Sequence, residues 1–529
     1  MAHGTLVARG AYHDSVVLLT LARALRARPG VRDAAALMGT PANRDLLAQA
    51  GLLTPEAETA GPNDLVVVIA ADSDATVAAA LALVDPLLAG STPRTGEGGR
   101  PRPRTLATAA RRMPEANLTL ISVPGAFAAA EARAALRIGT HVMLWSDNVS
   151  LEEERRLKRD AAERGLLLMG PDCGTAYVAG VGLGFANEVE RGPVGIVAAS
   201  GTGLQQVATL LAARGHGLSH GIGVGGRDMG REIGGIMTLA ALELLGGDEA
   251  TRVIVVLGKP PAAEVRAAVR SRLAAIGKPA VVCLLGRDHD AADVGGEAGS
   301  ADISSAVPVA VSTLEDAALA ACALLEKTGW RRQPFSIPDA ERRIAEARRT
   351  LTPGQSLVVG LYAGGTLAHE SLLILDPLIG PIASNLAGGA GRHRLIDLGA
   401  DEFTVGRAHP MLDPGARVDA IREAAARPEV AVLLLDVVLG HGAAADPAGD
   451  LADALRSARA GARAHGRGLV VVATVVGTAR DPQGLAAQIG TLEAAGAWVL
   501  PSNAQAARAA ACIAGGDAVQ RAVLGGARP

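Results

Sequence analysis

The chain has 529 residues, more than one ordinary hydrophobic core accommodates, so we expect roughly two to four domains. Hydrophobic residues make up 49% and charged residues 20%, a composition typical of soluble globular proteins. The formal net charge of -3 gives no electrostatic reason to expect a nucleic-acid or membrane partner. Aromatic residues, at 2%, are too few for the usual base-stacking surfaces.

The four cysteines and the first residues indicate a compartment. Cys173, Cys283, Cys322 and Cys512 are scattered and form no CxxC pair, which favours a reducing environment and argues against a zinc site. The start, MAHGTLVARG, lacks the apolar core of a signal peptide, and no stretch approaches the roughly 18 apolar residues that span a bilayer. We therefore expect a cytoplasmic protein without a bound metal.

Short apolar runs alternate with amphipathic helical patterns along almost the whole chain. Continuous apolar strands separated by helices predict parallel sheets that are covered on both faces, and hence an α/β protein. The predicted strands are DLVVVIA (64–70), LTLISV (118–123), THVMLW (140–145), GLLLMG (165–170), VGIVAAS (194–200), RVIVVLG (252–258), AVVCLLG (280–286), SLVVGLYA (356–363), VAVLLLDVV (430–438), LVVVATVVG (469–477) and AWVLPS (497–502).

Two stretches look like linkers between domains. Residues 90–104 (GSTPRTGEGGRPRPR) are rich in Gly, Pro and Arg and predict a solvated loop, and residues 331–339 (RRQPFSIPD) predict a domain boundary. The order strand, glycine turn and helix recurs on both sides of the second linker, which indicates a duplicated flavodoxin-like domain about a pseudo-twofold axis. Parallel α/β domains in general share this pattern, so common architecture is the alternative.

Each copy places a glycine turn between a strand and a helix. Ser200, Gly201, Thr202 and Gly203 form one turn, and Gly364, Gly365 and Thr366 form the other. The first N–H groups of a helix lack internal partners, and glycines let an anion approach them, so the paired turns predict an anion site. Neither turn is a complete GxGxxG, a P-loop or a GxSxG elbow. A tight turn capped by its own Ser or Thr is the structural alternative.

Two further glycine-rich clusters are candidate parts of a site. GIGVGGRDMGREIGG (221–235) carries Arg227 among seven glycines, a composition suited to phosphate or carboxylate, although a glycine-rich connection would look similar. In VVLGHGAAADPAGD (437–450), Gly440, His441 and Gly442 follow a strand. His441 is a candidate acid, base or anion donor near neutral pH, with a plain surface histidine as the alternative.

These segments together resemble the acyl-CoA synthetase family typified by succinyl-CoA synthetase, and most closely its FdrA branch. The resemblance rests on ISVPGAFAAAEARAALRIGTHVMLWSD and ERGLLLMGPDCGTAYVAG (121–180), on VAASGTG and GIGVGGRDM, and on residues 393–446. It implies a small N-terminal α/β domain with its linker (1–105), a Rossmann-like CoA-binding domain (106–190), and two ligase-like domains (191–332 and 333–529). The family's paired helix N-termini face one phosphorylated or acylated centre, which agrees with the reading of the two turns.

The chain also departs from that family in three places. It has no ATP-grasp domain, and DLVVVIAADSDAT offers no equivalent of the early glycine-rich CoA loop. Where the phosphohistidine loop should stand, the chain reads GRDHDAADVGGEAG, and His289 lies between Asp288 and Asp290. Those carboxylates would resist a negatively charged phosphoimidazole, so we expect His289 to be a solvated loop residue.

Three functions remain open. The first is a subunit of a carbamoyl- or acyl-transfer enzyme of the oxamate carbamoyltransferase type, implied by the FdrA resemblance, with carbamoyl phosphate or CoA as a substrate. Ser200, Thr202, Gly365 and Thr366 would supply donors, with Arg227 and His441 as catalytic candidates. The second is an acyl-CoA synthetase whose ATP-grasp part is a separate chain. The third is an anion- or CoA-binding regulatory protein. All three expect an anionic small molecule, and partner subunits or a homodimer.

Overall fold

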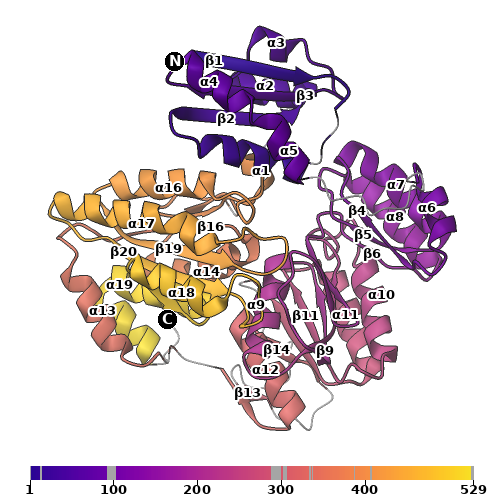
Figure 1. Cartoon of the computed structure of the whole chain (residues 1–529). Helices are drawn as coiled ribbons and strands as arrows, with labels where there is room; N and C mark the ends of the chain where they lie inside the picture. Colours follow the sequence, from indigo (N-terminus) through magenta and orange to yellow (C-terminus); the bar gives the residue numbers. More distant parts are fainter. Residues whose placement is uncertain are drawn as a thin grey trace. The chain divides into compact units, whose positions relative to one another are not determined.

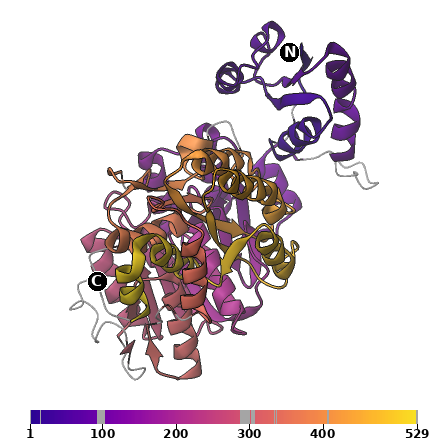
Figure 2. The ribbon, with the colours of Figure 1, turned by 90° about the vertical axis from the view of Figure 1, so that its left-hand side faces the viewer.

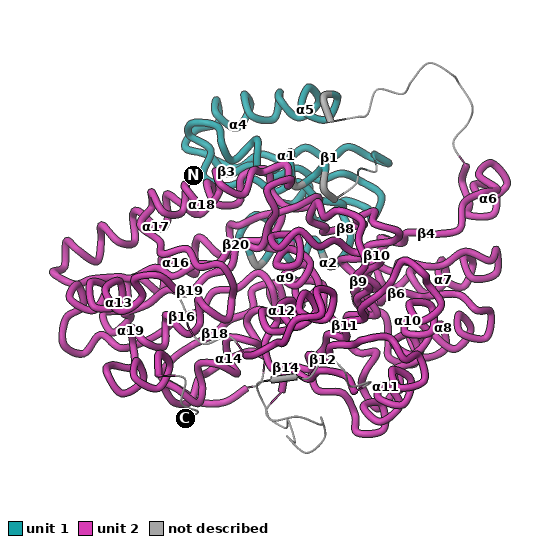
Figure 3. Tube along the Cα trace, turned by 90° about the horizontal axis from the view of Figure 1, so that it is seen from below, with its two compact units in different colours: residues 1–102, 404–408 teal, residues 103–403, 409–529 magenta. Residues whose placement is uncertain are grey.

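The computed structural model describes residues 2–11, 13, 15–91, 103–286, 300–301, 307–332, 335, 337–386, 388–404 and 408–525. These residues form two compact units, one of residues 1–102 with 404–408 and one of residues 103–403 with 409–529 (Figure 3). Each unit is described by itself. Residues 92–102 of the first predicted linker and His289 lie outside the described residues.

The first unit is a small sheet with helices on both faces. Its three strands have the order β1-β3-β2 and are all antiparallel. The central strand β3 is buried at every position, with α1, α4 and α5 covering one face and α2 and α3 the other. The elements are β1 (Ala2–Ala8), α1 (Ser15–Arg26), β2 (Val31–Met38), α2 (Pro41–Gln49), α3 (Pro55–Glu58), β3 (Leu65–Ala71), α4 (Asp74–Leu81) and α5 (Val84–Ser91).

The second unit begins with a three-stranded parallel sheet of order β4-β5-β6. Helices α7 and α8 pack beside it, and their apolar faces share a core with α10 and α11 of the next sheet. The elements are α6 (Leu106–Arg112), β4 (Leu118–Ile121), α7 (Gly125–Ile138), β5 (His141–Leu144), α8 (Leu151–Glu163) and β6 (Leu168–Met169).

The first ligase-like domain contains a seven-stranded sheet of order β14-β12-β11-β9-β10-β7-β8. The hairpin β7–β8 joins this sheet antiparallel, although both strands precede residue 191. The elements are β7 (Thr175–Val178), β8 (Val181–Gly184), β9 (Arg191–Ala198), α9 (Gly201–Ala212), β10 (Leu218–Gly223), α10 (Ile236–Gly247), β11 (Val253–Gly258), α11 (Ala263–Ile276), β12 (Ala280–Leu284), β14 (Val309–Val311) and α12 (Leu314–Glu326). The short strands β13 (Ser300–Ala301) and β15 (Trp330–Arg331) pair separately.

The second ligase-like domain has a six-stranded, fully parallel sheet of order β17-β18-β16-β19-β20-β21. Helices α16, α17 and α18 cover one face, and α14 and α19 cover the other (Figures 1 and 2). The elements are α13 (Ala340–Arg349), β16 (Leu357–Tyr362), α14 (Gly365–Ile379), β17 (Ile382–Ser384), β18 (His393–Asp397), α15 (Asp401–Thr404), α16 (Gly415–Ala426), β19 (Val430–Val438), α17 (Pro447–Ala464), β20 (Val470–Val476), α18 (Leu485–Ala494), β21 (Ala497–Leu500) and α19 (Asn503–Leu524).

The two ligase-like domains repeat one topology. When the edge strand β17 is left out and strands are numbered in chain order from the one before the glycine turn, both sheets contain the flavodoxin-like order 2-1-3-4-5. These strands are β10-β9-β11-β12-β14 and β18-β16-β19-β20-β21. Equivalent helices meet at their interface, because α9 and α12 of the first domain and α14 and α19 of the second share one hydrophobic core. This arrangement brings the two glycine turns to the same side of the interface.

The predicted α/β class and all eleven predicted strands are confirmed. The expectation of parallel sheets throughout is wrong for the first unit, whose sheet is antiparallel. Its apolar central strand is nevertheless buried on both faces, which is why its sequence looks like that of a parallel strand. No helix in the described part of the chain is long and apolar enough to cross a bilayer.

Candidate functional site

The first glycine turn caps helix α9. Ser200 has extended backbone angles, and its hydroxyl oxygen accepts a hydrogen bond from the Gly203 N–H at 2.9 Å. That bond satisfies one of the amides that a helix start leaves without an internal partner. The N–H groups of Gly201 and Thr202 remain at the positive end of the helix, where both residues are partly exposed.

The second glycine turn is held by a buried carboxylate. Asp436, near the carboxyl end of β19, accepts the N–H groups of Ala363 and Gly364, both at 2.8 Å. Arg417 pairs with the same carboxylate at 3.1 Å, and both side chains are buried. Helix α14 itself starts without a side-chain cap. Its first amides, beginning with Gly365, therefore remain available at the helix start.

The two turns meet. The Ser200 hydroxyl donates to the Thr366 hydroxyl oxygen at 2.6 Å. A Cβ at Gly364 would lie 3.0 Å from the Thr202 side chain, and one at Gly203 would lie 3.2 Å from Thr366 Cγ2, so a side chain at either position would crowd the contact between the turns. Because the Thr366 oxygen accepts the Ser200 hydrogen, the hydrogen of the Thr366 hydroxyl is left to donate to a ligand. The bond from Ser200 polarises this hydroxyl and strengthens it as a donor.

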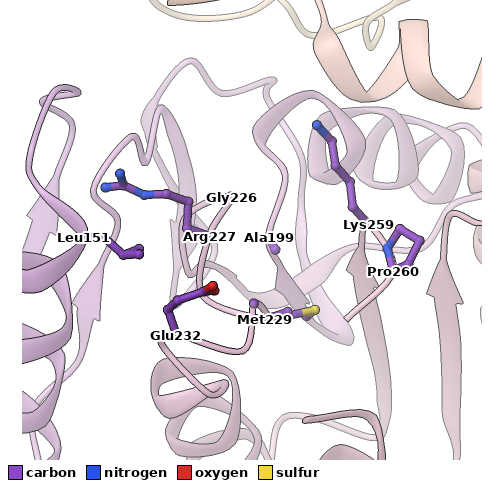
Figure 4. A pocket seen from close by; sticks show the side chains of 9 residues that line it. Leu151, Ala199, Gly226, Arg227, Met229, Glu232, Lys259 and Pro260 are labelled. Carbon is purple, nitrogen blue, oxygen red and sulfur yellow. The ribbon is translucent and has the colours of Figure 1, made fainter. Parts of the chain in front are cut away.

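A cavity of about 340 Å³ lies beside the first turn (Figure 4). It starts at Ala199, directly before Ser200, and Lys259 lies at the end of the neighbouring strand β11. Figure 4 shows the charged ends of Arg227 at the upper left and Lys259 at the upper right of the cavity, with Glu232 lower down. Within the described chain, Lys259 forms no hydrogen bond or ion pair. The remaining lining residues are Leu151, Gly226, Met229, Gly230 and Pro260.

Arg227 belongs to the loop of residues 221–235, and a buried ion cluster holds this loop. The Lys158 ammonium on α8 contacts Glu154 and Asp228, both at 2.8 Å, and none of the three side chains is more than 1% exposed. Asp228 also accepts the Thr238 N–H at 2.9 Å. Arg227 pairs with Glu154 at 2.8 Å and remains about half exposed at the cavity. The glycine-rich loop is thus a fixed wall of the cavity.

The predicted cluster around His441 lies at a different contact between the ligase-like domains. The His441 ring contacts the Glu188 carboxylate at 2.5 Å, and both side chains are more than half exposed. The His441 backbone pairs with Ala186 as an isolated bridge, and the Gly440 N–H donates to Gln483 at 3.0 Å. Gly440 and Gly442 both have positive φ angles. Through these contacts the cluster helps to hold the two ligase-like domains together.

Two carboxylates of the site were not singled out from the sequence. Asp436 interrupts the apolar run VLLLDVV, and Asp397 ends HRLID. Acidic residues are rare inside or at the end of a buried strand, so these positions could have marked both residues as candidates. Asp397 is 7% exposed, and one of its oxygens lies against Gly365 at the start of α14. Burial, first of all, raises the pKa of Asp397 to about 6.

Nearby ionisable groups do not assemble into a metal centre. Among the residues that the structure describes, no group of three or more His, Cys, Asp or Glu side chains could hold a metal ion. The four cysteines are all buried and unpaired. Burial, above all, raises the pKa of Cys173 to about 12, which keeps this thiol protonated at neutral pH.

Three family models match parts of the chain. The CoA-ligase model matches residues 361–513, and the CoA binding domain model matches residues 189–286. Residues 189–286 include strands β9 to β12 of the first ligase-like domain. A model described as AllF, heavy metal-associated domain, matches residues 1–103, a region without cysteine. The chain thus combines a CoA-ligase domain with a CoA-binding domain.

A curated relative covers almost the whole chain. The protein named Uncharacterized protein YahF, from Escherichia coli (strain K12), is 39% identical over 503 residues, which are 93% of this chain and 95% of that protein. The chain belongs to the YahF family. Within it, a shorter stretch of 153 residues is 30% identical to Succinate--CoA ligase [ADP-forming] subunit alpha 2 of Archaeoglobus fulgidus. That match covers 28% of this chain and 52% of the subunit.

Two solved structures are similar to parts of this chain. Acetyl-coenzyme A synthetase 1 of Ca. Korarchaeum cryptofilum, in complex with phosphate and ADP, has a TM-score of 0.32 and 17% identity over 78% of this chain and 85% of that chain. ATP citrate lyase from Methanothrix soehngenii has a TM-score of 0.31 and 20% identity over 42% of this chain and 37% of that chain.

Proposed function

We propose that the chain is a subunit of a carbamoyl- or acyl-transfer enzyme that binds the phosphate or the carbonyl oxyanion of its substrate at the two joined turns. The observation that carries this proposal is the hydrogen bond between Ser200 and Thr366, which joins the N-termini of α9 and α14 from the two ligase-like domains. Each helix start carries partial positive charge, so two of them side by side favour an anion more than one does.

Carbamoyl phosphate has the chemistry that suits such a site. It presents a dianionic phosphate next to a carbonyl, and the carbonyl oxygen becomes negative when a nucleophile attacks. The amides of α9 and α14, the Thr366 hydroxyl and the Lys259 ammonium provide donors for both groups. Oxamate is the acceptor that the FdrA resemblance suggests. Additional subunits would supply what this chain lacks for turnover.

An ATP-dependent acyl-CoA synthetase with a separate ATP-grasp chain is the second candidate. The similarity to a succinate–CoA ligase alpha subunit and the CoA-ligase and CoA-binding models favour it. The cavity fits the reactive end of CoA: Leu151, Met229 and Pro260 are apolar walls for the pantetheine arm, and Arg227 and Lys259 are cations for a phosphate. When bound, CoA would supply a thiol nucleophile.

The two candidates differ in the phosphate donor that they consume. The chain is purified from its own cells together with the proteins that accompany it. Phosphate release is then measured with carbamoyl phosphate plus oxamate, and protein phosphorylation is measured with labelled ATP. We expect phosphate release in the first assay and its loss in Thr366→Val, with the partly exposed Thr491→Val on α18 as the control.

The possible results separate the hypotheses. Labelling of the chain by ATP without turnover of carbamoyl phosphate would replace the first candidate with the second. Tight binding of anions without turnover in either assay would favour a regulatory protein. Equal activity of Thr366→Val and Thr491→Val would remove the joined turns from the mechanism.

A further inference from the structure

Asp397 is a buried carboxylate with one oxygen that has no partner. Its Oδ1 accepts the Gly399 N–H at 2.9 Å, and its backbone is held on both sides by Asn385. Its Oδ2 makes no hydrogen bond with any described residue. That oxygen lies against the start of α14, because a Cβ at Gly365 would be 2.4 Å from it. The side chain as a whole is only 7% exposed, but this oxygen is not fully buried, so a molecule bound at the start of α14 can reach it.

A structural role at the helix start does not account for Asp397. A carboxylate in this position usually caps the helix, but α14 has no side-chain cap. The turn before the helix is already held by Asp436, which accepts the N–H groups of Ala363 and Gly364. Asp397 Oδ2 is therefore directed at the place where the amides of α14 and the Thr366 hydroxyl are free.

The surroundings of Asp397 suit a group that exchanges a proton near neutral pH. Burial and the nearby carboxylates of Asp436 and Asp172 raise its pKa, and the Lys259 ammonium lowers it, with a resulting value of about 6. His409 lies on the same side of Gly399, because a Cβ there would be 2.6 Å from His409 Nε2 and 3.2 Å from Asp397 Oδ1. Burial lowers the pKa of that imidazole to about 4. Asp397 is thus a carboxylate at pH 7 beside a neutral imidazole. Such a carboxylate is close to the ideal for general base catalysis.

We propose that Asp397 is the general base of this site. The inference rests on the proposed function and adds the residue that takes the proton. A nucleophile that carries an N–H or S–H attacks the carbonyl carbon of an acyl or carbamoyl phosphate. As the new bond to carbon forms, the proton passes to Asp397 Oδ2. The carbon–oxygen bond to phosphate then breaks, phosphate leaves with the electron pair, and the proton passes from Asp397 to water.

Binding of sulfate tests the position of Asp397 without any turnover, since sulfate does not titrate between pH 5 and 8. In the wild-type chain we expect the affinity for sulfate, measured by calorimetry, to fall about tenfold as the pH rises from 5 to 7.5, because the ionised carboxylate repels the anion. Asp397→Asn should bind sulfate equally at both pH values. The exposed Asp419→Asn on α16 is the control and should behave like wild type.

Turnover by the complex tests the catalytic step. Asp397→Asn should lower kcat by about 10²- to 10⁴-fold, and the rise of kcat/KM through a pKa near 6 should disappear. Asp419→Asn should keep both. If Asp397→Asn still binds sulfate but keeps the kcat and pH profile of wild type, Asp397 is not the base. If the wild-type complex neither binds sulfate nor releases phosphate, the proposed function fails instead, and circular dichroism of each variant shows whether it is folded.

Discussion

Ser200 uses one hydroxyl for two purposes. It accepts the Gly203 N–H as the cap of α9 and donates its hydrogen to Thr366 in the other ligase-like domain. A hydroxyl can do both, because it has one donor hydrogen and two acceptor lone pairs. The capping part alone would explain a serine at this position. The bond to Thr366 is not explained by capping, and it joins Ser200 to the other half of the site.

The two purposes can be separated with a matched variant. Ser200→Ala should lower the free energy of unfolding by about 1 kcal/mol through the lost cap, and weaken sulfate binding by about three- to tenfold because Thr366 loses its polarising partner. Ser502→Ala removes the equivalent cap of α19, where Ser502 accepts the Gln505 N–H at 3.2 Å, and should affect stability only. Urea unfolding and calorimetry check both. Equal sulfate affinity in the two variants would contradict the role of Ser200 in the site.

Helix α14 begins without a capping side chain. Its cap position is a glycine, and the buried pair of Asp436 and Arg417 holds the preceding turn instead of a side-chain cap. This arrangement keeps the first amides of α14 free. It also requires glycine at position 365, since the Asp397 carboxylate occupies the space that a side chain would need.

Gly365→Ala should therefore destabilise the protein. The added methyl group would have to displace the Asp397 carboxylate or the turn, which costs about 1–3 kcal/mol of unfolding free energy. The control is Gly490→Ala in α18, where a Cβ would meet no atom within 4 Å. There we expect a gain of about 0.5–1 kcal/mol, because glycine is the poorer helix former. Chemical denaturation of both variants gives the comparison, and two changes of the same sign would refute the crowding at Gly365.

Across the whole molecule, a buried carboxylate connects the two ligase-like domains. Glu370 on α14 accepts the N–H of Leu314, the first residue of α12, at 2.7 Å, and the Asn503 side-chain amide of α19 at 2.7 Å. It is 1% exposed, and burial raises its pKa from 4.5 to about 7. At mildly acidic pH, Glu370 therefore keeps its proton in the folded chain, whereas the same residue in the unfolded chain has already lost it.

Stability should consequently fall as the pH rises from about 4.5 to 7. Over this range the folded state binds the Glu370 proton and the unfolded state does not, and the difference in pKa corresponds to about 3 kcal/mol. Glu370→Gln should lose this part of the pH dependence, and the exposed Glu249→Gln should keep it. Urea unfolding at pH 5 and pH 7.5 measures the effect. An unchanged pH dependence in Glu370→Gln would assign it to other groups.

Much of the fold was predictable because its signals are local. The apolar strands of the parallel sheets are continuous runs, and the glycine turns stand where strand and helix patterns meet, so both could be read from the sequence. The hairpin β7–β8 could not be assigned to its sheet in this way. Its pairing with β10 depends on contacts between Tyr177 and Gly221, which are far apart in the chain.

The sequence by itself determined the α/β class, the duplicated flavodoxin-like order and the two turns as candidates, because strand periodicity and glycine positions are properties of neighbouring residues. Only the tertiary structure decided that Ser200 reaches Thr366, that Asp397 lies against Gly365, and that Lys158 is buried with Glu154 and Asp228. In sequence, Glu154 and Lys158 look like an exposed pair on a charged helix. Whether a charge is solvated, paired or free to act depends on which distant segments fold against it, and that information is absent from its local sequence.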